Sequence, residues 1–258
     1  MLLGVNIDHI ATLREARKIN DPNPLEAIFI LKNAGASQVT LHLREDRRHI
    51  HDEDVSLILQ ASPLPINLEC ASEEKIIDLV CRLKPHRATL VPEKREEVTT
   101  EGGLNLKLPN LKDSIAKLKS HQISTSLFIN PDEESILQAL ELGVDSIELH
   151  TGEWANLHLM AYSNLPRMHN AISSMPTDRI LLEQKLNECL DKLKISAKIA
   201  KDQGLAVYAG HGLNYQNVSP IVSIQEITEL NIGHSIIARS IFVGLFEAIR
   251  EMQRLLQR

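Results

Sequence analysis

The chain has 258 residues, of which 43% are hydrophobic and 3% aromatic, and its formal net charge is −6. Barrels of alternating strands and helices with about 250 residues commonly form a single domain, so we expect one domain over the whole chain. The negative charge and the few aromatic residues argue against nonspecific nucleic-acid binding, which needs a basic face and often aromatic stacking platforms.

The sequence also lacks the usual signs of export or membrane insertion. Charge occurs at Asp8, too early for a signal peptide, and no uncharged apolar run approaches the roughly 18 residues of a membrane-spanning helix. Cys70, Cys81 and Cys189 lie far apart, which disfavours a disulfide framework and a cysteine-based zinc site. We therefore expect a cytoplasmic protein with no membrane partner.

Eight short apolar or β-branched runs predict β-strands. In chain order they cover residues 3–7, 38–43, 65–69, 87–91, 124–129, 145–149, 205–209 and 226–232. Between most of them, apolar residues recur at helical spacing. Two examples are the set Leu182, Leu186, Leu190, Leu193 and Ala197 and the set Ile241, Leu245, Ala248, Met252 and Leu255. Strands and helices are therefore predicted to alternate.

Three predicted helix-to-strand joints carry a glycine, at Gly35, Gly143 and Gly204, which can adopt the left-handed conformation that ends a helix. This repetition indicates a repeated strand–helix unit, which can form a closed barrel or an open doubly wound sheet. The eight strands, the chain length and the absence of a G-x-G-x-x-G turn after the first strand favour an eight-stranded parallel TIM barrel with extra helices.

One connection is unusually long, because about 55 residues separate the sixth predicted strand from the seventh. Residues 156–177 precede any clear helix, and we interpret the region of about 155–180 as an insertion after the sixth strand. Loops of this length are usually functional or mobile.

The carboxyl ends of the predicted strands carry a surplus of histidine and carboxylate. A barrel enzyme builds its site from these ends and from the loops that follow them. Exposure to solvent explains why strand ends are polar, but it does not explain this surplus. The positions are Asn6, Asp8, His9, His42, Arg44, Glu69, Glu93, Lys94, Asn130, Asp132, Glu148, His150, Thr151, His211, Asn231 and His234.

Several of these positions suggest a specific chemistry. His42 and Arg44 lie two residues apart on one predicted strand and should face the barrel interior together, where histidine exchanges protons and arginine clamps carboxylate or phosphate. Glu69 ends an apolar strand, and partial burial there would raise its pKa and suit a general base; a salt bridge to a neighbouring arginine is equally compatible. His211 lies between two glycines, where the backbone can approach a ligand closely.

The segment after the eighth strand predicts a phosphate site. Asn231, Gly233 and His234 lead into the last helix, and the loops after strands seven and eight form the recurrent phosphate site of this fold together with a helix N-terminus. Residues 92–103 carry charges, paired threonines and two glycines at the end. This composition fits a lid over the site, and it fits an ordinary solvated loop as well.

Five long segments resemble those of the pyridoxine 5'-phosphate synthase family. They are GVNIDHIATLREAR (4–17), HLREDRRHI (42–50), LVPEKREEVTTEGG (90–103), AGHGLNYQN (209–217) and ELNIGHSIIARSI (229–241). The likeness covers nearly the whole chain, with one departure, since the region of about 155–180 looks longer than in other members. The resemblance implies a transferase-type ring closure that joins 1-deoxy-D-xylulose 5-phosphate to 3-amino-2-oxopropyl phosphate, in a homo-octamer, with no metal or organic cofactor.

The resemblance also implies roles for individual residues. His42, Glu69 and His211 match the proton-transfer residues of the family, in agreement with the interpretation of the strand ends. The positions that match ligands of the amino-ketone phosphate are Asn6, Arg17, Gly212, Gly233 and His234. The positions that match ligands of the deoxyxylulose phosphate are Asp8, His9, Arg44, His49 and Thr99.

Two other functions are compatible with these residues. A metal-dependent aldolase or hydrolase could place an ion among Asp8, His42, Glu69, His150 and His211, although no H-x-H follows the first strand. A non-catalytic sensor of phosphorylated metabolites would need the arginines and glycines, but it would not need Glu69.

Overall fold

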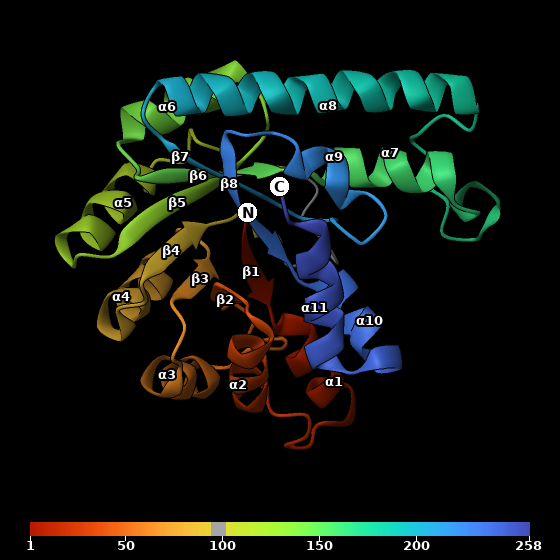
Figure 1. Cartoon of the computed structure of the whole chain (residues 1–258). Helices are drawn as coiled ribbons and strands as arrows, with labels where there is room; N and C mark the ends of the chain where they lie inside the picture. Colours follow the sequence, from red (N-terminus) through yellow and green to blue (C-terminus); the bar gives the residue numbers. More distant parts are fainter. Residues whose placement is uncertain (94–101) are drawn as a thin grey trace.

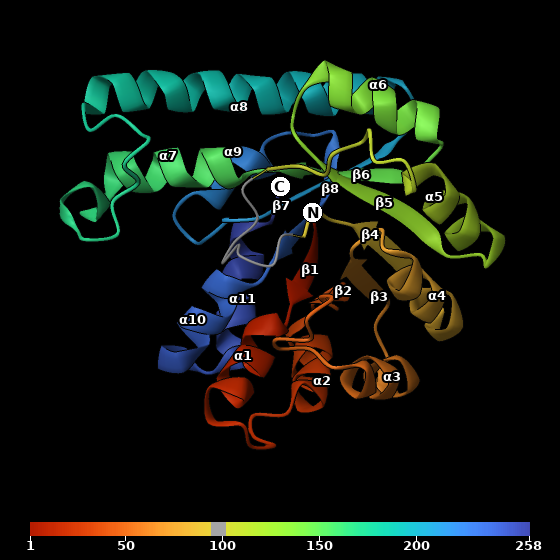
Figure 2. The same ribbon diagram turned by 180° about the vertical axis from the view of Figure 1, so that it is seen from behind.

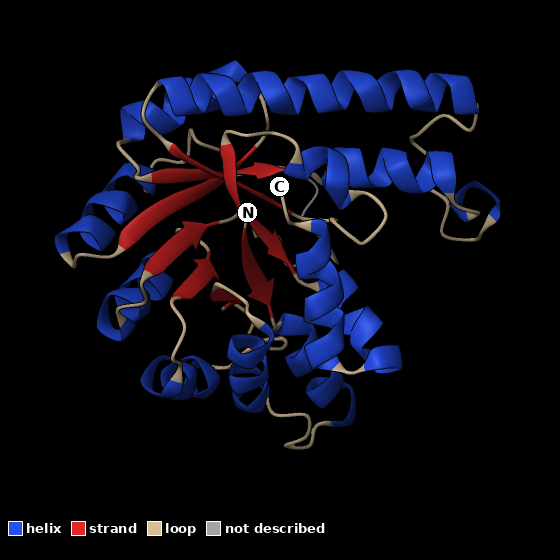
Figure 3. Cartoon of the chain, in the orientation of Figure 1, coloured by secondary structure: helices blue, strands red, loops and turns tan. Residues whose placement is uncertain are grey.

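The computed structural model describes residues 1–93 and 102–258, and its strands close into one barrel (Figures 1 and 3). The strands are β1 (Leu2–Asn6), β2 (Gln38–His42), β3 (Ile66–Cys70), β4 (Arg87–Leu90), β5 (Ser124–Ile129), β6 (Ser146–His150), β7 (Ala206–Gly210) and β8 (Ile227–Ile232). Neighbouring strands are parallel, and β8 pairs with β1 to close the ring. The predicted TIM barrel is confirmed, and each predicted strand agrees with the observed one to within one residue at both ends.

Helices follow the strands and surround the barrel, as the two opposite views show (Figures 1 and 2). They are α1 (Asp8–Arg17), α2 (Pro24–Ala34), α3 (Asp52–Ala61), α4 (Glu74–Leu83), α5 (Leu111–Ser120), α6 (Glu133–Leu142), α7 (Gly152–Tyr162), the 3-10 helix η1 (Leu165–Arg167), α8 (Arg179–Asp202), α9 (Val218–Val222), α10 (His234–Val243) and α11 (Leu245–Leu255). Among the described residues, none of these helices has the length and hydropathy needed to span a membrane.

The predicted glycine joints are confirmed. Gly35, Gly143 and Gly204 stand at or just after the ends of α2, α6 and α8, with φ angles of +94°, +72° and +88°. A residue with a Cβ is strained in this left-handed conformation, so glycine allows each helix to stop and the chain to turn into the next strand.

Side chains alternate along the strands, with apolar groups toward the helices and polar groups toward the barrel interior. Val39 and Leu41 of β2 are fully buried in the hydrophobic core. Thr40 between them instead donates a hydrogen bond to Oδ1 of Asn231 on β8, at 3.0 Å. The hydrophobic core therefore lies mainly between the strands and the helices, and the same alternation directs His42 into the barrel mouth.

The region after β6 differs from the prediction. Residues 156–177 do not all precede a helix, because α7 runs from Gly152 to Tyr162 and buries Trp154, Leu157 and Met160. Apolar residues lie on most sides of this segment, so its sequence lacks the contrast between polar and apolar positions that marks a surface helix. Together with η1 and the start of α8, α7 projects beyond the rest of the helical layer (Figures 1 and 2).

The final helical segment is also divided. Gly244, with φ of +81°, separates α10 from α11, so the predicted stripe from Ile241 to Leu255 does not lie on one helix. Ala248 and Met252 of α11 are buried as expected, whereas Ile241 on α10 is 69% exposed.

Candidate active site

Two of the three proton-transfer candidates, His42 and Glu69, lie at the carboxyl ends of adjacent strands, whereas His211 follows β7. His42 and Glu69 are paired residues of β2 and β3. One ligand atom from each of Asp8, His42 and Glu69 lies within 4.8 Å of the others. Among the described residues, this set is the one compatible with a metal ion, and it contains three of the five residues of the metal-dependent alternative.

Asp8 holds this end of β2 in place. Its Oδ1 accepts a hydrogen bond from the His42 backbone N–H at 2.8 Å, and its Oδ2 accepts one from the Asn6 side-chain amide at 2.8 Å. The Asn6 Oδ1 in turn accepts a bond from the Asp8 backbone N–H at 2.9 Å. Asn6, the last residue of β1, and Asp8, the first residue of α1, are therefore hydrogen-bonded to each other and to the end of β2 at His42.

The surroundings of Glu69 favour its protonated form. Its side chain is half-buried at the end of β3. Burial, followed by repulsion from Glu148 and Asp8, raises the pKa of Glu69 well above its usual value. The alternative of an arginine salt bridge is not observed among the described residues.

Glu148 lies deeper in the barrel and belongs to a polar network. Its Oε2 accepts a hydrogen bond from the Asn231 amide at 2.7 Å, and burial raises the pKa of Glu148 to about 7 against the effect of that bond. That value also includes repulsion from Glu229, which raises the pKa, and attraction to Arg87, which lowers it. Glu148 is thus a buried carboxyl group that interacts with Glu69 and titrates close to neutrality.

His211 follows β7 in an unusual conformation, with φ of +79°. Its ring lies against those of His150 and Phe128, with centroid distances of 5.0 Å and 6.2 Å. Burial lowers the pKa of His211, and burial with the nearby His211 lowers the pKa of His150 to about 4. An ideal Cβ on Gly152 would lie 2.5 Å from the His150 Nε2 and 3.0 Å from the His211 Cδ2, so this glycine leaves room for both rings.

Several predicted ligands of the amino-ketone phosphate lie together where β8 leads into α10. Gly233 precedes the first turn of α10, and an ideal Cβ on it would lie 2.9 Å from the Asn6 Cβ. His234 begins the helix, and its ring is 4.8 Å from that of His9. Burial and the nearby His234 lower the pKa of His9. Free amide groups at this helix start are suited to bind an anion.

The remaining predicted ligands are placed in different ways. Gly212 follows His211 with φ of +80°. His49 lies near His42, with ring centroids 6.3 Å apart. Arg17 is exposed at the end of α1, and no hydrogen bond or ion pair joins it to the site residues that the structure describes. Thr99, with Lys94 and most of the predicted 92–103 lid, lies outside the described residues.

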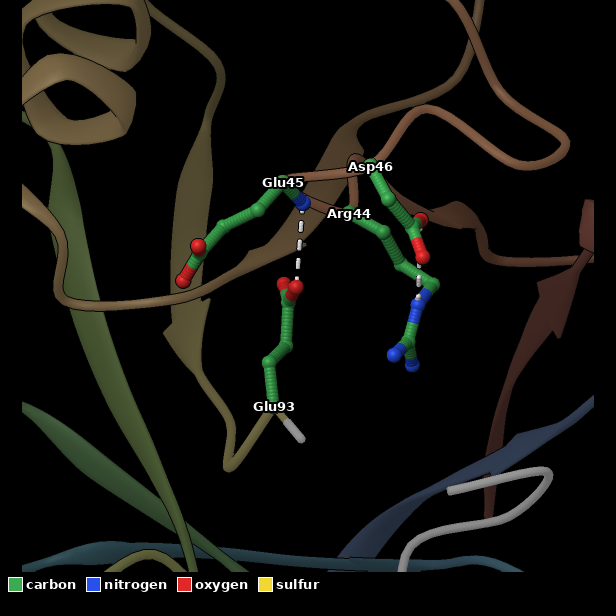
Figure 4. A pocket seen from close by; sticks show the side chains of 4 residues that line it. All are labelled: Arg44, Glu45, Asp46 and Glu93. Atoms are coloured by element: carbon green, nitrogen blue, oxygen red, sulfur yellow. Dashed lines mark hydrogen bonds and ion pairs between the residues drawn. The ribbon is translucent and has the colours of Figure 1, made fainter. Parts of the chain in front are cut away.

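Arg44 stands two residues past the end of β2, not on the strand as predicted. It lines a pocket together with Glu45, Asp46 and Glu93, and its Nε lies 3.6 Å from the Asp46 Oδ1 (Figure 4). Because the strand stops at His42, the arginine reaches the mouth from a loop.

Three further strand-end residues, Glu93, Glu148 and His150, have no role in the family resemblance, although His150 belongs to the metal-dependent alternative. The Glu93 Oε1 lies 2.7 Å from the His42 Nε2. Glu148 repels the charged form of Glu69, and the His150 ring packs against the ring of His211. From the sequence, only their positions after β4 and on β6 could indicate a role. Their contacts could not be predicted, because they depend on how the barrel brings distant strand ends together.

Comparison with known proteins gives a match over almost the whole chain. The family model described as Pyridoxal phosphate biosynthesis protein PdxJ matches residues 3–258. A protein of Wolinella succinogenes named pyridoxine 5'-phosphate synthase is 60% identical over 260 residues, covering 100% of this chain and 99% of the relative. A protein of the same name from Aliarcobacter butzleri is 57% identical over 259 residues, covering 100% and 99%.

Solved structures with low sequence identity share the fold. A thiamine phosphate pyrophosphorylase from Pyrococcus furiosus is 12% identical, with a TM-score of 0.59 over 99% of this chain and 95% of that one. An N-(5'-phosphoribosyl)anthranilate isomerase from the same organism is 13% identical, with a TM-score of 0.58 over 99% and 98%. These likenesses support the barrel alone.

Proposed function

The chain belongs to the PdxJ family of pyridoxal phosphate biosynthesis proteins, and we propose on this basis that it is an enzyme that forms pyridoxine 5'-phosphate. The reaction condenses 1-deoxy-D-xylulose 5-phosphate with 3-amino-2-oxopropyl phosphate and releases phosphate and water. The observation that carries the proposal is the family match over residues 3–258, in a barrel whose mouth gathers His42 and Glu69 within reach of Asp8. Family membership does not favour a metal-dependent aldolase or a sensor.

The chemistry explains why the site needs several proton carriers. An amine must attack a ketone, and loss of water and phosphate followed by ring closure must move protons between carbon, nitrogen and oxygen. Each positioned acid or base can contribute about 10²- to 10⁴-fold to such a reaction. In this proposal Glu69 and His42 remove protons during imine formation and tautomerisation.

His211 donates a proton to the departing oxygen in this scheme. Its lowered pKa favours the neutral ring near pH 7. His211 must therefore gain a proton before it can act as a donor. The proton can come from an earlier step of the reaction, or a nearby phosphate dianion can raise the pKa of the ring so that it binds one.

The two phosphorylated substrates are assigned to different parts of the mouth. The residues proposed for the amino-ketone phosphate are Gly233 and His234 at the start of α10, Asn6 at the end of β1, Gly212 and Arg17. The proximity of Asn6 to Gly233 supports this grouping. Asp8, His9, Arg44, His49 and Thr99 are proposed for the deoxyxylulose phosphate.

The family likeness further suggests a homo-octamer in the cytoplasm, with the reaction requiring no metal or organic cofactor. A reducing compartment suits the three free cysteines, Cys70, Cys81 and Cys189, which are all buried. The Asp8, His42 and Glu69 set could hold a cation, but both Asp8 oxygens already accept hydrogen bonds.

The test is to mix chelator-treated protein with both substrates and follow pyridoxine 5'-phosphate by mass and absorbance. Product without added metal would support the proposal. No product from folded protein would contradict it, and stoichiometric zinc or manganese in the purified protein would favour the metal-dependent alternative. Substrate binding without any turnover would instead indicate a sensor.

A further inference from the structure

We propose that Glu93 is a positioning residue that fixes the His42 ring in one tautomer and ties it to the loop carrying Arg44. The proposal rests on the proton-transfer role of His42 proposed above. Glu93 follows β4, whereas His42 ends β2, so the contact crosses the barrel mouth over the intervening strand β3.

The first contact selects the tautomer. The Glu93 Oε1 lies 2.7 Å from the His42 Nε2, and the two side chains are only 5% and 11% exposed. Burial raises the pKa of Glu93, but its bonds to His42 and to the Glu45 backbone outweigh this and lower the pKa below its usual value. An ionised carboxylate only accepts hydrogen bonds, so Nε2 must carry a hydrogen. Nδ1 is then the nitrogen left to exchange a proton with a substrate.

The second contact reaches the substrate-binding loop. The Glu93 Oε2 accepts a hydrogen bond from the Glu45 backbone N–H at 3.0 Å, next to Arg44 (Figure 4). One carboxylate therefore holds both a proton carrier and the backbone beside a predicted phosphate ligand. A shift of Glu93 would disturb both.

The other ionisable groups around His42 do not replace this contact. Asp8 binds the His42 backbone and the Asn6 amide with its two oxygens. His49 faces the His42 ring edge-on at 6.3 Å, and Glu69 lies on the adjacent strand. Among the described residues, Glu93 is the side chain that hydrogen-bonds the His42 ring.

Glu93→Gln separates the two contacts. The amide oxygen can still accept from the Glu45 N–H, while the amide nitrogen then faces Nε2 and donates to it. His42 must move its hydrogen to Nδ1, and we expect kcat to fall by about 10²-fold or more with KM nearly unchanged. Glu93→Ala removes both contacts and should lower kcat and also raise KM. The matched control is Glu134→Gln, since Glu134 is exposed on α6 and should leave both constants unchanged.

A measurement that needs no turnover keeps the test independent of folding losses and of the proposed function. In ¹⁵N-histidine NMR, the His42 signal, identified by its absence in His42→Asn, should show hydrogen on Nε2 in the wild type and on Nδ1 in Glu93→Gln. Hydrogen on Nδ1 in the wild type, or wild-type kcat in Glu93→Gln, would overturn the proposal. Absence of pyridoxine 5'-phosphate from the wild type would defeat the proposed function, and the tautomer would still decide the role of Glu93.

Discussion

Glu69, which is half-buried, and Glu148, which is buried, are held where burial favours their protonated forms. In the window between the usual pKa of a glutamate and the raised folded value, the native state binds a proton that the unfolded chain has released. Unfolding becomes easier as the pH rises through this window, because the slope of stability with pH is negative when the native state holds more protons. These residues therefore cost stability at alkaline pH in exchange for proton carriers at the mouth.

Glu148→Gln should reveal this cost. The pKa of Glu148 is raised from 4.5 to about 7, so the variant should be more stable than the wild type at pH 8 by on the order of 2 kcal/mol. The gain should vanish well below pH 4.5, where the folded and unfolded states both bind the proton. Urea unfolding at the two pH values measures it, with the exposed Glu153→Gln as control. Equal stability of variant and wild type at pH 8 would contradict the prediction.

Gly152→Ala should damage the site more than the fold. The added Cβ would meet the His150 Nε2 at 2.5 Å and must displace that ring and the neighbouring His211. We expect activity to fall by about 10-fold or more, since a small displacement of a catalytic group is costly. Steady-state kinetics with circular dichroism tests this. The control is Glu153→Ala, an exposed neighbouring position, which should leave the activity nearly unchanged. Unchanged activity in Gly152→Ala would show that the reaction tolerates the displacement of His211.

At the scale of elements, Arg14 joins α1 to the start of α3 and to the loop between β2 and α3. Its guanidinium binds both Asp54 oxygens, at 2.6 Å and 2.8 Å, and donates to the His49 carbonyl at 2.8 Å. The two side chains are 10% and 12% exposed. This bidentate pair holds the loop that carries Arg44 and His49.

Arg14→Gln should destabilise the protein by about 3 kcal/mol, because it leaves the partly buried Asp54 carboxylate without its partner. It should also raise KM, since the loop loses its anchor. Chemical unfolding and kinetics measure the two effects. Adding Asp54→Asn should recover part of the lost stability, and strictly additive losses in this double-mutant cycle would argue against the pair.

The strands could be predicted because each combines β-branched or apolar residues with a clear end, and the glycines at 35, 143 and 204 mark the joints. Helix α7 was missed because it is apolar on most sides. His42, Glu69 and His211 were predicted from strand-end positions. The contact of His42 with Glu93 joins residues 51 positions apart. It could not be predicted, because it depends on how far each loop extends and the local sequence pattern does not show this.

For the whole molecule, the exposed apolar side chains bear on assembly. Ile241, Phe242 and Phe246 at the junction of α10 and α11 are 69%, 80% and 49% exposed. Large exposed apolar groups that lie together often mark an interface. This region is therefore our candidate for contacts in the proposed octamer.

Phe242→Glu should lower the mass of the assembly measured by light scattering, because a charge would have to be buried in the contact. Leu137→Glu is the control, since Leu137 is 45% exposed on α6, away from α10 in both views (Figures 1 and 2). A monomeric wild type would show that the octamer does not apply to this chain, and an unchanged mass in Phe242→Glu would place the interface elsewhere.

The polar barrel interior also constrains how this sequence can diverge. Arg87 donates to Glu229 at 2.6 Å, and Gln38 donates to the same oxygen at 2.8 Å. Apolar side chains can be exchanged one at a time, whereas each donor here requires its acceptor. Evolutionary drift inside this barrel should therefore be correlated, with lineages that lose Glu229 also replacing Arg87, while Val39 and Leu41 on the outer face vary independently.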